Sequence, residues 1–364
     1  MKKINLSRTT YRRISTMSTR DSQTIPLPDG RTLGFAEYGH PTGYPLLCFH
    51  GYPTSRLEAY GLDKLACRRR IRIIALDRPG FGLSTFQQHR LLIDWPEDVQ
   101  SFKESKGLKR FAVMGLSGGG PYALACAYKM PSEVMSAVGL MASAGPWVAG
   151  RKGLPWYTWV NYYGANYFPA GYRVMMDGLV GMMRWAVTTG PVTRWIDKAL
   201  QGLREKQKEK KEKNKVLAEE EDEEKPIAES RERMLRLMFE GFAQGSWAAV
   251  QEAQLLSSQD WGFKFEDVAY DKIQIWHGTQ DNNAPVHMIR YLAQRLPCCT
   301  LKEYENDTHF TMGDHFEEIL EALVPEKVVD EYMRETEAED TKEVRSGNPA
   351  QKRQGFSSSA EEVL

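Results

Sequence analysis

Short apolar runs recur towards both ends of the chain, and longer segments of mixed polarity separate them. An apolar run without alternation is typical of a strand that is covered on both faces, as in a parallel sheet. Strands that alternate with helical segments predict an α/β fold, because parallel strands need a crossover connection, most often a helix. The predicted strands are residues 23–27, 32–38, 45–49, 71–76, 111–114, 135–141, 272–277 and 300–304.

The first two of these strands are joined by Pro28-Asp29-Gly30, whose residues favour a hairpin turn. The remaining connections carry helical patterns. The expected helices are residues 57–69, 90–107, 122–128, 286–296 and 315–324. The pattern therefore predicts a mostly parallel sheet of eight strands with helices on both faces.

Residues 146–255 interrupt this alternation with a segment that is helical in character and rich in aromatic side chains. The segment lies between two predicted sheet strands, so it predicts a helical cap inserted over the strand ends. The sheet domain is then divided into residues 21–145 and residues 256–334. The aromatic residues are Trp147, Trp156, Tyr157, Trp159, Tyr162, Tyr163, Tyr167, Phe168, Trp185, Trp195 and Trp247.

Three polar stretches contain too little apolar surface to fold by themselves. Residues 201–233 form a charged insertion within the cap, first rich in lysine and then acidic, and are expected to be a solvated helix or a disordered loop. Residues 335–364 are expected to be a disordered tail. Residues 1–20 are expected to be a disordered basic tail, although their basic, acid-free composition also resembles a mitochondrial presequence.

Composition narrows the classes of function. The 364 residues have a formal net charge of zero, which gives no support to a nucleic-acid partner. The five cysteines are few, odd in number and without metal-ligand spacing, which indicates a reducing compartment and no metal site. Cys48 and Cys126 lie in apolar runs and are expected in the core. We expect a cytoplasmic protein, with a mitochondrial location as the alternative, and no transmembrane helix.

Residues 111–127 contain the strongest chemical motif. A predicted strand leads into Gly115-Leu116-Ser117-Gly118-Gly119, and a predicted helix follows. This G-x-S-x-G pattern between a strand and a helix is typical of a nucleophile elbow, in which a strained turn exposes the serine. The alternative interpretation is a flexible glycine loop with an ordinary serine.

A serine nucleophile needs a base, and the base needs an acid to orient it. Asp281 follows the predicted strand 272–277, and His309 follows the predicted strand 300–304. Serine, aspartate and histidine in this order, each after the end of a strand, predict the catalytic residues Ser117, Asp281 and His309. His315 is the competing base, although it falls within or at the start of the last predicted helix.

With these motifs the chain resembles the α/β-hydrolase fold superfamily, in particular its capped serine-hydrolase members with an HG-x-P oxyanion loop. The resemblance covers residues 24–324 apart from the charged insertion. It implies that the backbone N–H groups of Tyr52 and Gly118 form the oxyanion hole, and that Tyr52 and Leu116 contact the substrate. The motifs are His50-Gly51-Tyr52-Pro53, residues 77–82, the elbow at Ser117, residues 277–281 and Thr308-His309-Phe310.

The expected function is a serine hydrolase that cleaves a carboxylic ester, lactone or thioester of a small hydrophobic molecule, without a cofactor. Ser117 argues against epoxide and halide chemistry, since capped relatives with those activities have an aspartate at the elbow. Two alternatives stay open: hydrolysis of a carbon–carbon bond or a lyase-like step with the same triad, and a small-molecule receptor with little turnover. Residues 155–172 contain no acid, which permits contact of the cap with a membrane surface.

Overall fold

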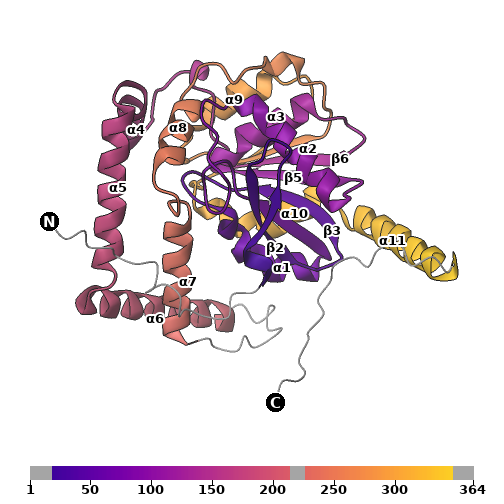
Figure 1. Ribbon diagram of the computed structural model, residues 1–364, viewed down its shortest axis with the longest axis horizontal. Helices are drawn as coiled ribbons and strands as arrows, with labels where there is room; N and C mark the ends of the chain where they lie inside the picture. Colours follow the sequence, from indigo (N-terminus) through magenta and orange to yellow (C-terminus); the bar gives the residue numbers. More distant parts are fainter. Residues whose placement is uncertain (1–18, 214–225, 347–364) are drawn as a thin grey trace.

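The computed structural model describes residues 19–213 and 226–346 (Figure 1). Eight strands form one sheet, in the order β1-β2-β4-β3-β5-β6-β7-β8. β1 pairs antiparallel with β2 and β2 antiparallel with β4, and all the other pairs are parallel. The strands are β1 (Gln23–Pro26), β2 (Thr32–Gly39), β3 (Tyr44–Phe49), β4 (Ile71–Leu76), β5 (Phe111–Leu116), β6 (Met135–Met141), β7 (Ile273–Gly278) and β8 (Thr300–Tyr304).

The α-helices fall into two groups (Figure 1). Those of the sheet domain are α1 (Asp63–Arg68), α2 (Trp95–Lys106), α3 (Gly120–Lys129), α9 (Val286–Arg295), α10 (Phe316–Leu323) and α11 (Glu326–Ser346). Those between β6 and β7 are α4 (Trp156–Tyr167), α5 (Pro169–Ala186), α6 (Gly190–Lys213), α7 (Ile227–Glu240) and α8 (Trp247–Leu256). The predicted α/β-hydrolase sheet is confirmed, with helices on both faces and a helical segment inserted before β7.

Short 3₁₀ turns precede or connect several of these elements. They are η1 (Thr19–Asp21), η2 (Arg56–Leu62), η3 (Leu92–Asp94), η4 (Ser117–Gly119), η5 (Trp147–Ala149), η7 (Phe265–Asp267) and η8 (Thr311–His315). Two predicted helices are consequently shorter than expected, because η2 occupies the first half of one and η3 precedes the other. In the second case Pro96 lies in the first turn of α2, where its missing N–H costs no helical hydrogen bond.

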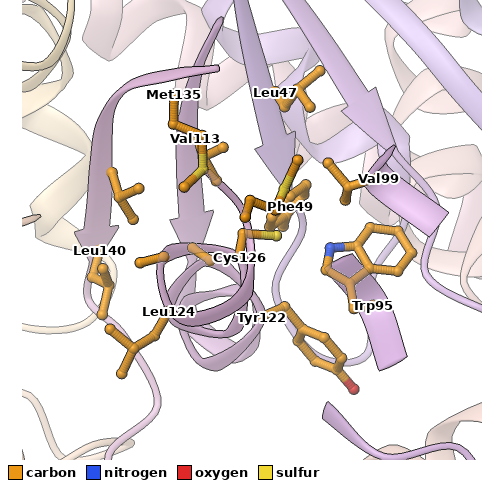
Figure 2. Packing of buried hydrophobic residues seen from close by; sticks show 14 of the residues in the cluster. Leu47, Phe49, Trp95, Val99, Val113, Tyr122, Leu124, Cys126, Met135 and Leu140 are labelled. Atoms are coloured by element: carbon orange, nitrogen blue, oxygen red, sulfur yellow. The ribbon is translucent and has the colours of Figure 1, made fainter. Parts of the chain in front are cut away.

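The hydrophobic core has two layers because successive side chains of a strand point to opposite faces of the sheet. Leu47 and Phe49 of β3 join the layer formed with α2, α3 and α9, whereas Leu46 and Cys48 join the layer under α1 and α10. Figure 2 shows Phe49 close to Cys126, which projects from α3. Both cysteines that were expected in the core are buried there.

The expected disorder from Glu335 onwards is wrong as far as Ser346, because α11 continues to that residue. The first turns of α11 are held to the sheet domain. Val329 is buried, the Tyr332 ring lies 5.2 Å from that of Tyr44, and Asp330 pairs with Arg70 at 2.6 Å. The remaining residues favour a helix by composition, since glutamate, alanine, lysine and arginine are good helix formers.

The charged insertion is also partly ordered. α6 runs to Lys213 and α7 begins at Ile227, and Arg231 of α7 pairs with Asp197 of α6 at 2.5 Å. Residues 214–225, 1–18 and 347–364 lie outside the described residues, so the expectations for them are not tested. In the part of the chain that the structure describes, no helix has the length and hydropathy needed to span a bilayer.

Candidate active site

Ser117 lies in η4, directly between β5 and α3, with a positive φ of 49°. A non-glycine residue in this region is strained and is held there only by its surroundings. The flanking glycines allow the turn. A Cβ on Gly115 would lie 2.5 Å from the carbonyl oxygen of Gly119, and a Cβ on Gly119 would lie 2.2 Å from that of Phe49. The sequence therefore forms an elbow that projects Ser117 beyond the end of β5.

The three residues predicted to act together converge at this point. Nε2 of His309 lies 3.0 Å from Oγ of Ser117, and Nδ1 of His309 lies 2.7 Å from Oδ2 of Asp281. Asp281 follows β7 and His309 follows β8, so neighbouring parallel strands carry both side chains to the same edge of the sheet. A continuous hydrogen-bonded chain thus joins carboxylate, imidazole and hydroxyl.

Asp281 is buried and fixed by its own loop. Its Oδ1 accepts hydrogen bonds from the backbone N–H groups of Asn283 and Ala284, at 2.8 and 2.9 Å. This arrangement leaves Oδ2 for the Nδ1–H of His309. Nε2 of His277 donates to the carbonyl oxygen of Ala284 at 2.8 Å, which fixes the same loop from the end of β7. The loop therefore holds one carboxylate oxygen towards His309.

The competing base, His315, has a different partner. Its Nε2 lies 2.8 Å from Oδ2 of Asp307, and its ring packs against that of Tyr304 with centroids 3.9 Å apart. His315 ends η8 and caps α10, as its position in the sequence suggested. His315 therefore pairs with Asp307, whereas His309 lies between Asp281 and Ser117.

Tyr52 and Gly118, whose N–H groups were predicted to form an oxyanion hole, lie next to each other. The point where a Cβ on Gly118 would lie is 3.2 Å from the backbone nitrogen of Tyr52. Between Tyr52 and His50, the N–H of Gly51 donates to Oε2 of Glu58 at 2.5 Å. The loop that carries Tyr52 is therefore tied to η2 beside Ser117.

A cluster of buried charged residues also holds the loop that carries Tyr52. The guanidinium of Arg78 donates to the carbonyl oxygens of His50 and Gly51, and it pairs with Glu252 of α8 at 2.5 Å. Glu252 also accepts hydrogen bonds from Arg90 and from the hydroxyl of Tyr122. Burial opposes ionisation of Glu252, but Arg78 and Arg90 together hold its pKa below the ordinary value. Glu252 thus connects the inserted helices to the loop of Tyr52.

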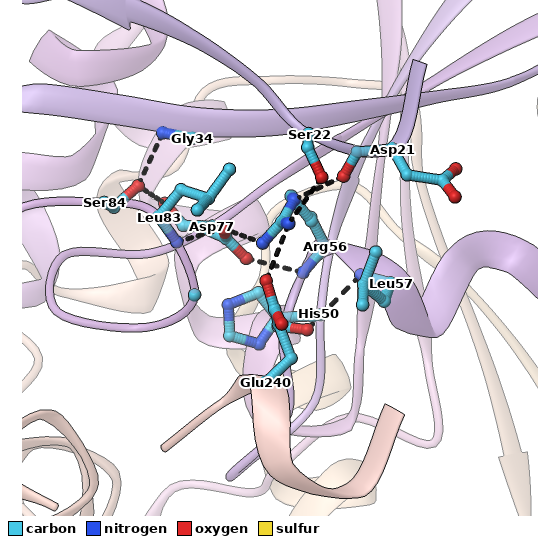
Figure 3. A network of polar contacts seen from close by, with 12 residues as sticks. Asp21, Ser22, Gly34, His50, Arg56, Leu57, Asp77, Leu83, Ser84 and Glu240 are labelled. Carbon is cyan, nitrogen blue, oxygen red and sulfur yellow. Dashed lines mark hydrogen bonds and ion pairs between the residues drawn. The ribbon is translucent and has the colours of Figure 1, made fainter. Parts of the chain in front are cut away.

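A second polar network, shown in Figure 3, fixes the region around Asp77. Asp77 is buried and accepts hydrogen bonds from the backbone and the guanidinium of Arg56, at 2.7 and 2.8 Å, and from the N–H of Leu83 at 2.9 Å. Arg56 also pairs with Glu240 of α7 at 2.7 Å. These contacts agree with a structural rather than a chemical role for Asp77.

A cavity of about 730 Å³ lies beside Ser117 and His309. Tyr52 and Leu116, the predicted substrate contacts, are both part of its wall. The sheet domain, η5, α4 and α8 contribute the other residues, most of them apolar or aromatic. They include Met141, Trp147, Tyr157, Tyr162, Leu256, Met288 and Phe316, with Thr54, Glu58, Thr158, Asn161, Ser257 and Asn283 as polar members.

Glu58 and Glu252 were not identified from the sequence, although Glu252 leaves a signal there. Glu252 is the single charged residue in the apolar helix Trp247–Leu256. A carboxylate in such a helix would be costly to bury without a partner, so it indicates a buried cation elsewhere in the chain. The sequence does not show which arginines supply it, because Arg78 and Arg90 lie 174 and 162 residues away.

Two buried histidines make the folding stability depend on pH. Burial lowers the pKa of His50 well below its ordinary value of 6.5, and Arg78 adds to the effect. Burial also lowers the pKa of His277, which Asp281 opposes only in part. Both rings are therefore neutral in the folded chain at a pH where the unfolded chain already binds protons.

We expect the free energy of unfolding to fall as the pH drops below the ordinary histidine value of 6.5. Each of the two histidines contributes a slope of about 1.4 kcal/mol per pH unit until its folded-state pKa is reached. Urea unfolding at a series of pH values measures the slope. His277→Gln should remove the contribution of one proton, so the slope should fall by about 1.4 kcal/mol per pH unit. His89→Asn, at an exposed histidine with φ of 59°, should leave the slope unchanged. An unchanged slope in His277→Gln would show that His277 is not held neutral.

Comparison with known proteins agrees with this architecture. The sequence model of the alpha/beta hydrolase fold family matches residues 44–168, which run from β3 to the end of α4. No curated protein matches the sequence.

Solved structures with a similar fold include two esterases and a hydrolase. The esterase from Exiguobacterium antarcticum is 18% identical, with a TM-score of 0.55 over 83% of this chain and 97% of its own. The hydrolase from Pseudomonas aeruginosa PA01 is 16% identical, with a TM-score of 0.54 over 84% and 99%. The esterase from Rhodococcus sp. ECU1013 is 15% identical, with a TM-score of 0.51 over 82% and 97%. Its sheet order and these matches show that the chain has the α/β-hydrolase fold.

Proposed function

We propose that the protein is a serine hydrolase that cleaves a carboxylic ester, lactone or thioester of a small hydrophobic molecule. The observation that carries this proposal is the hydrogen-bonded chain from Asp281 through His309 to Ser117, which ends at the wall of the cavity. A serine hydroxyl becomes an effective nucleophile when an oriented imidazole accepts its proton. The geometry required for this transfer, a hydrogen bond of about 2.6–3.2 Å, is present before any substrate binds.

In this proposal, Oγ of Ser117 attacks the carbonyl carbon of the substrate while Nε2 of His309 takes the hydroxyl proton. Asp281 keeps the imidazole in the required tautomer and stabilises the imidazolium. The negative charge that develops on the carbonyl oxygen is stabilised by the N–H groups of Tyr52 and Gly118. Losing one such donor typically costs about 3–4 kcal/mol of transition-state stabilisation.

The tetrahedral intermediate then collapses to an acyl-enzyme. His309 returns its proton to the leaving alcohol or thiol, and Ser117 keeps the acyl group. A water molecule, deprotonated by the same imidazole, attacks the acyl carbon and releases the acid. Since both half-reactions use one base and one oxyanion site, no cofactor is required.

The lining of the cavity favours an apolar substrate. Ligand pockets of this kind are mostly apolar, with a few polar groups that set orientation. Besides Ser117 and His309, the polar residues here are Thr54, Glu58, Thr158, Asn161, Ser257 and Asn283, among aromatic and aliphatic side chains. Residues 146–255 act as the cap in this proposal, because η5, α4 and α8 supply part of the cavity wall. Glu252 then links movement of the cap to the loop that carries Tyr52.

Fluorophosphonate labelling, combined with a panel of p-nitrophenyl esters of increasing chain length, tests this function. We expect one label, on Ser117, and turnover that rises with the length of the acyl chain until the cavity is filled. Labelling of Ser117 without turnover of any ester, lactone or thioester would favour the carbon–carbon hydrolase or receptor alternatives. Labelling of another residue would contradict the assignment of the nucleophile.

A further inference from the structure

α5 exposes an apolar face along its whole length. Every strongly exposed residue of this helix is apolar or a glycine, whereas the solvent face of an ordinary surface helix is polar. In Figure 1 α5 lies at the left edge of the molecule, with α7 and α8 on its inner side. The large exposed side chains are Val174, Met175, Leu179, Met182 and Trp185, with exposed fractions between 48% and 68%.

The charged residues of α5 are instead paired with other groups of the protein. Arg173 pairs with Asp177 at 2.9 Å, and Asp177 accepts a hydrogen bond from the N–H of Ser246. Arg184 donates to the carbonyl oxygens of Phe239 in α7 and of Phe242 just after it. The charged groups of the helix are therefore paired, and its most exposed side chains are apolar. Water alone does not favour this orientation, so the face indicates a partner.

α4 extends the same kind of surface. Trp156, Val160, Tyr163 and Tyr167 recur at helical spacing and are all exposed, and Phe168 follows with 72% of its surface exposed. An open groove of about 470 Å³ lies between α4 and α5. Its lining has no charged side chain. The lining residues are Trp159, Val160, Tyr163, Gly164, Phe168, Gly171, Tyr172 and Met175.

Basic residues outnumber acidic residues in the segment that forms this surface. Residues 134–196 contain one acid, Asp177, and five basic residues. Asp177 is already neutralised by Arg173. The exposed Arg151 lies over the ring of Trp159, with its guanidinium carbon 5.4 Å from the ring centre, and Trp159 lines the groove. A cation beside an apolar groove is complementary to an anionic headgroup with its acyl chain.

We propose that the outer face of α4 and α5 docks on an anionic lipid surface, with an acyl chain in the groove and Arg151 at the headgroups. The aromatic residues at both ends of α5 support this occupant, because tryptophan and tyrosine are enriched where a membrane meets water. No spanning helix is needed. The helices lie on the surface, with only their outer side chains inserted.

This docking places the lipid beside the catalytic cavity. Tyr157, Asn161 and Tyr162 line that cavity from the other side of α4. The Trp147 ring, also in the cavity wall, makes an edge contact with Trp159 of the groove at 5.9 Å. A substrate dissolved in the lipid would therefore have a short path to Ser117. This consequence rests on the proposed hydrolase activity, whereas the docking itself does not.

Co-sedimentation of the full chain with vesicles tests the proposal. We expect binding to vesicles of phosphatidylcholine and phosphatidylserine, and weaker binding to phosphatidylcholine alone. The double variant Val174→Ser/Met182→Ser should bind at least roughly tenfold more weakly, since it removes exposed apolar surface without disturbing the core. The matched control is Leu91→Ser, which removes a side chain that is 54% exposed outside this face, and it should bind as the native chain does.

A second variant, Arg151→Gln, tests whether Arg151 contacts the lipid headgroups. It should weaken binding to phosphatidylserine vesicles about fivefold and leave binding to phosphatidylcholine unchanged. An equal loss on both vesicles would overturn the headgroup assignment. Absence of vesicle binding by the native chain would overturn the proposal, as would a dimer in solution that Val174→Ser/Met182→Ser dissociates, because the face would then bind a second copy. The assay measures binding, so its outcome is independent of whether any ester is hydrolysed.

Discussion

Ser117→Ala is expected to lower the turnover of every ester substrate by roughly four to six orders of magnitude. The variant keeps the Cβ, and therefore the backbone turn, but it removes the oxygen that lies 3.0 Å from Nε2 of His309. Without a nucleophile the remaining groups can only bind the substrate and polarise its carbonyl. Initial rates with p-nitrophenyl esters measure the loss, and circular dichroism should show an unchanged fold.

The matched control is Ser132→Ala, at an exposed serine before β6, which should keep full activity. Fluorophosphonate should label the control variant and fail to label Ser117→Ala. Residual turnover of more than a few per cent in purified Ser117→Ala would sink the assignment of the nucleophile. Loss of the folded circular dichroism signal would instead indicate that the hydroxyl is needed for the turn.

The strands that could be predicted from the sequence are those in which one pattern of apolar positions continues from the first residue to the last. β4, β6 and β8 were predicted with their observed bounds, because an apolar or alternating run between turn residues has few other stable arrangements. Ser117, Asp281 and His309 could be identified as a set for a topological reason. Each follows a strand of a parallel sheet, and such strand ends meet at one edge.

The parts that could not be predicted depend on contacts between distant segments. Glu252 is buried because Arg78 and Arg90 surround it, and no local pattern specifies that pairing. The C-terminal residues as far as Ser346 were expected to be disordered because they are highly charged, yet the same residues have high helix propensity. Charge density alone therefore did not separate a solvated helix from a disordered segment.

The positions of the aromatic residues of the inserted helices could not be predicted for the same reason. The sequence shows that this segment is rich in tryptophan and tyrosine, but it does not show whether each of them forms the core of the cap or lines a pocket. The structure places Trp147 and Tyr162 at the cavity, but Trp156 and Trp185 are 76% and 68% exposed. Hydrophobic periodicity predicts that a helix has an apolar face. It does not say whether that face meets the protein or an outside partner.

His309→Ala is expected to lower kcat/KM by roughly four orders of magnitude or more, while His315→Ala stays close to the native value. Both variants remove one imidazole from the same loop region, so they form a matched pair. In the proposed mechanism His309 accepts the proton of Ser117 and the buried Asp281 orients it, whereas His315 pairs with the partly exposed Asp307. A partly exposed ion pair contributes about 1 kcal/mol or less, so His315→Ala should lose little thermal stability.

Steady-state kinetics on one ester, together with thermal unfolding of both variants, decides between the two histidines. His309→Ala should also be labelled slowly by fluorophosphonate, because Ser117 then lacks a base at 3.0 Å. Similar losses in both variants, without a change in melting temperature, would mean that the proton passes through both rings and that His309 is not the sole base. A large loss in His315→Ala alone would move the base to His315 and its acid to Asp307, and the hydrogen-bonded chain from Asp281 to Ser117 would then have no part in catalysis.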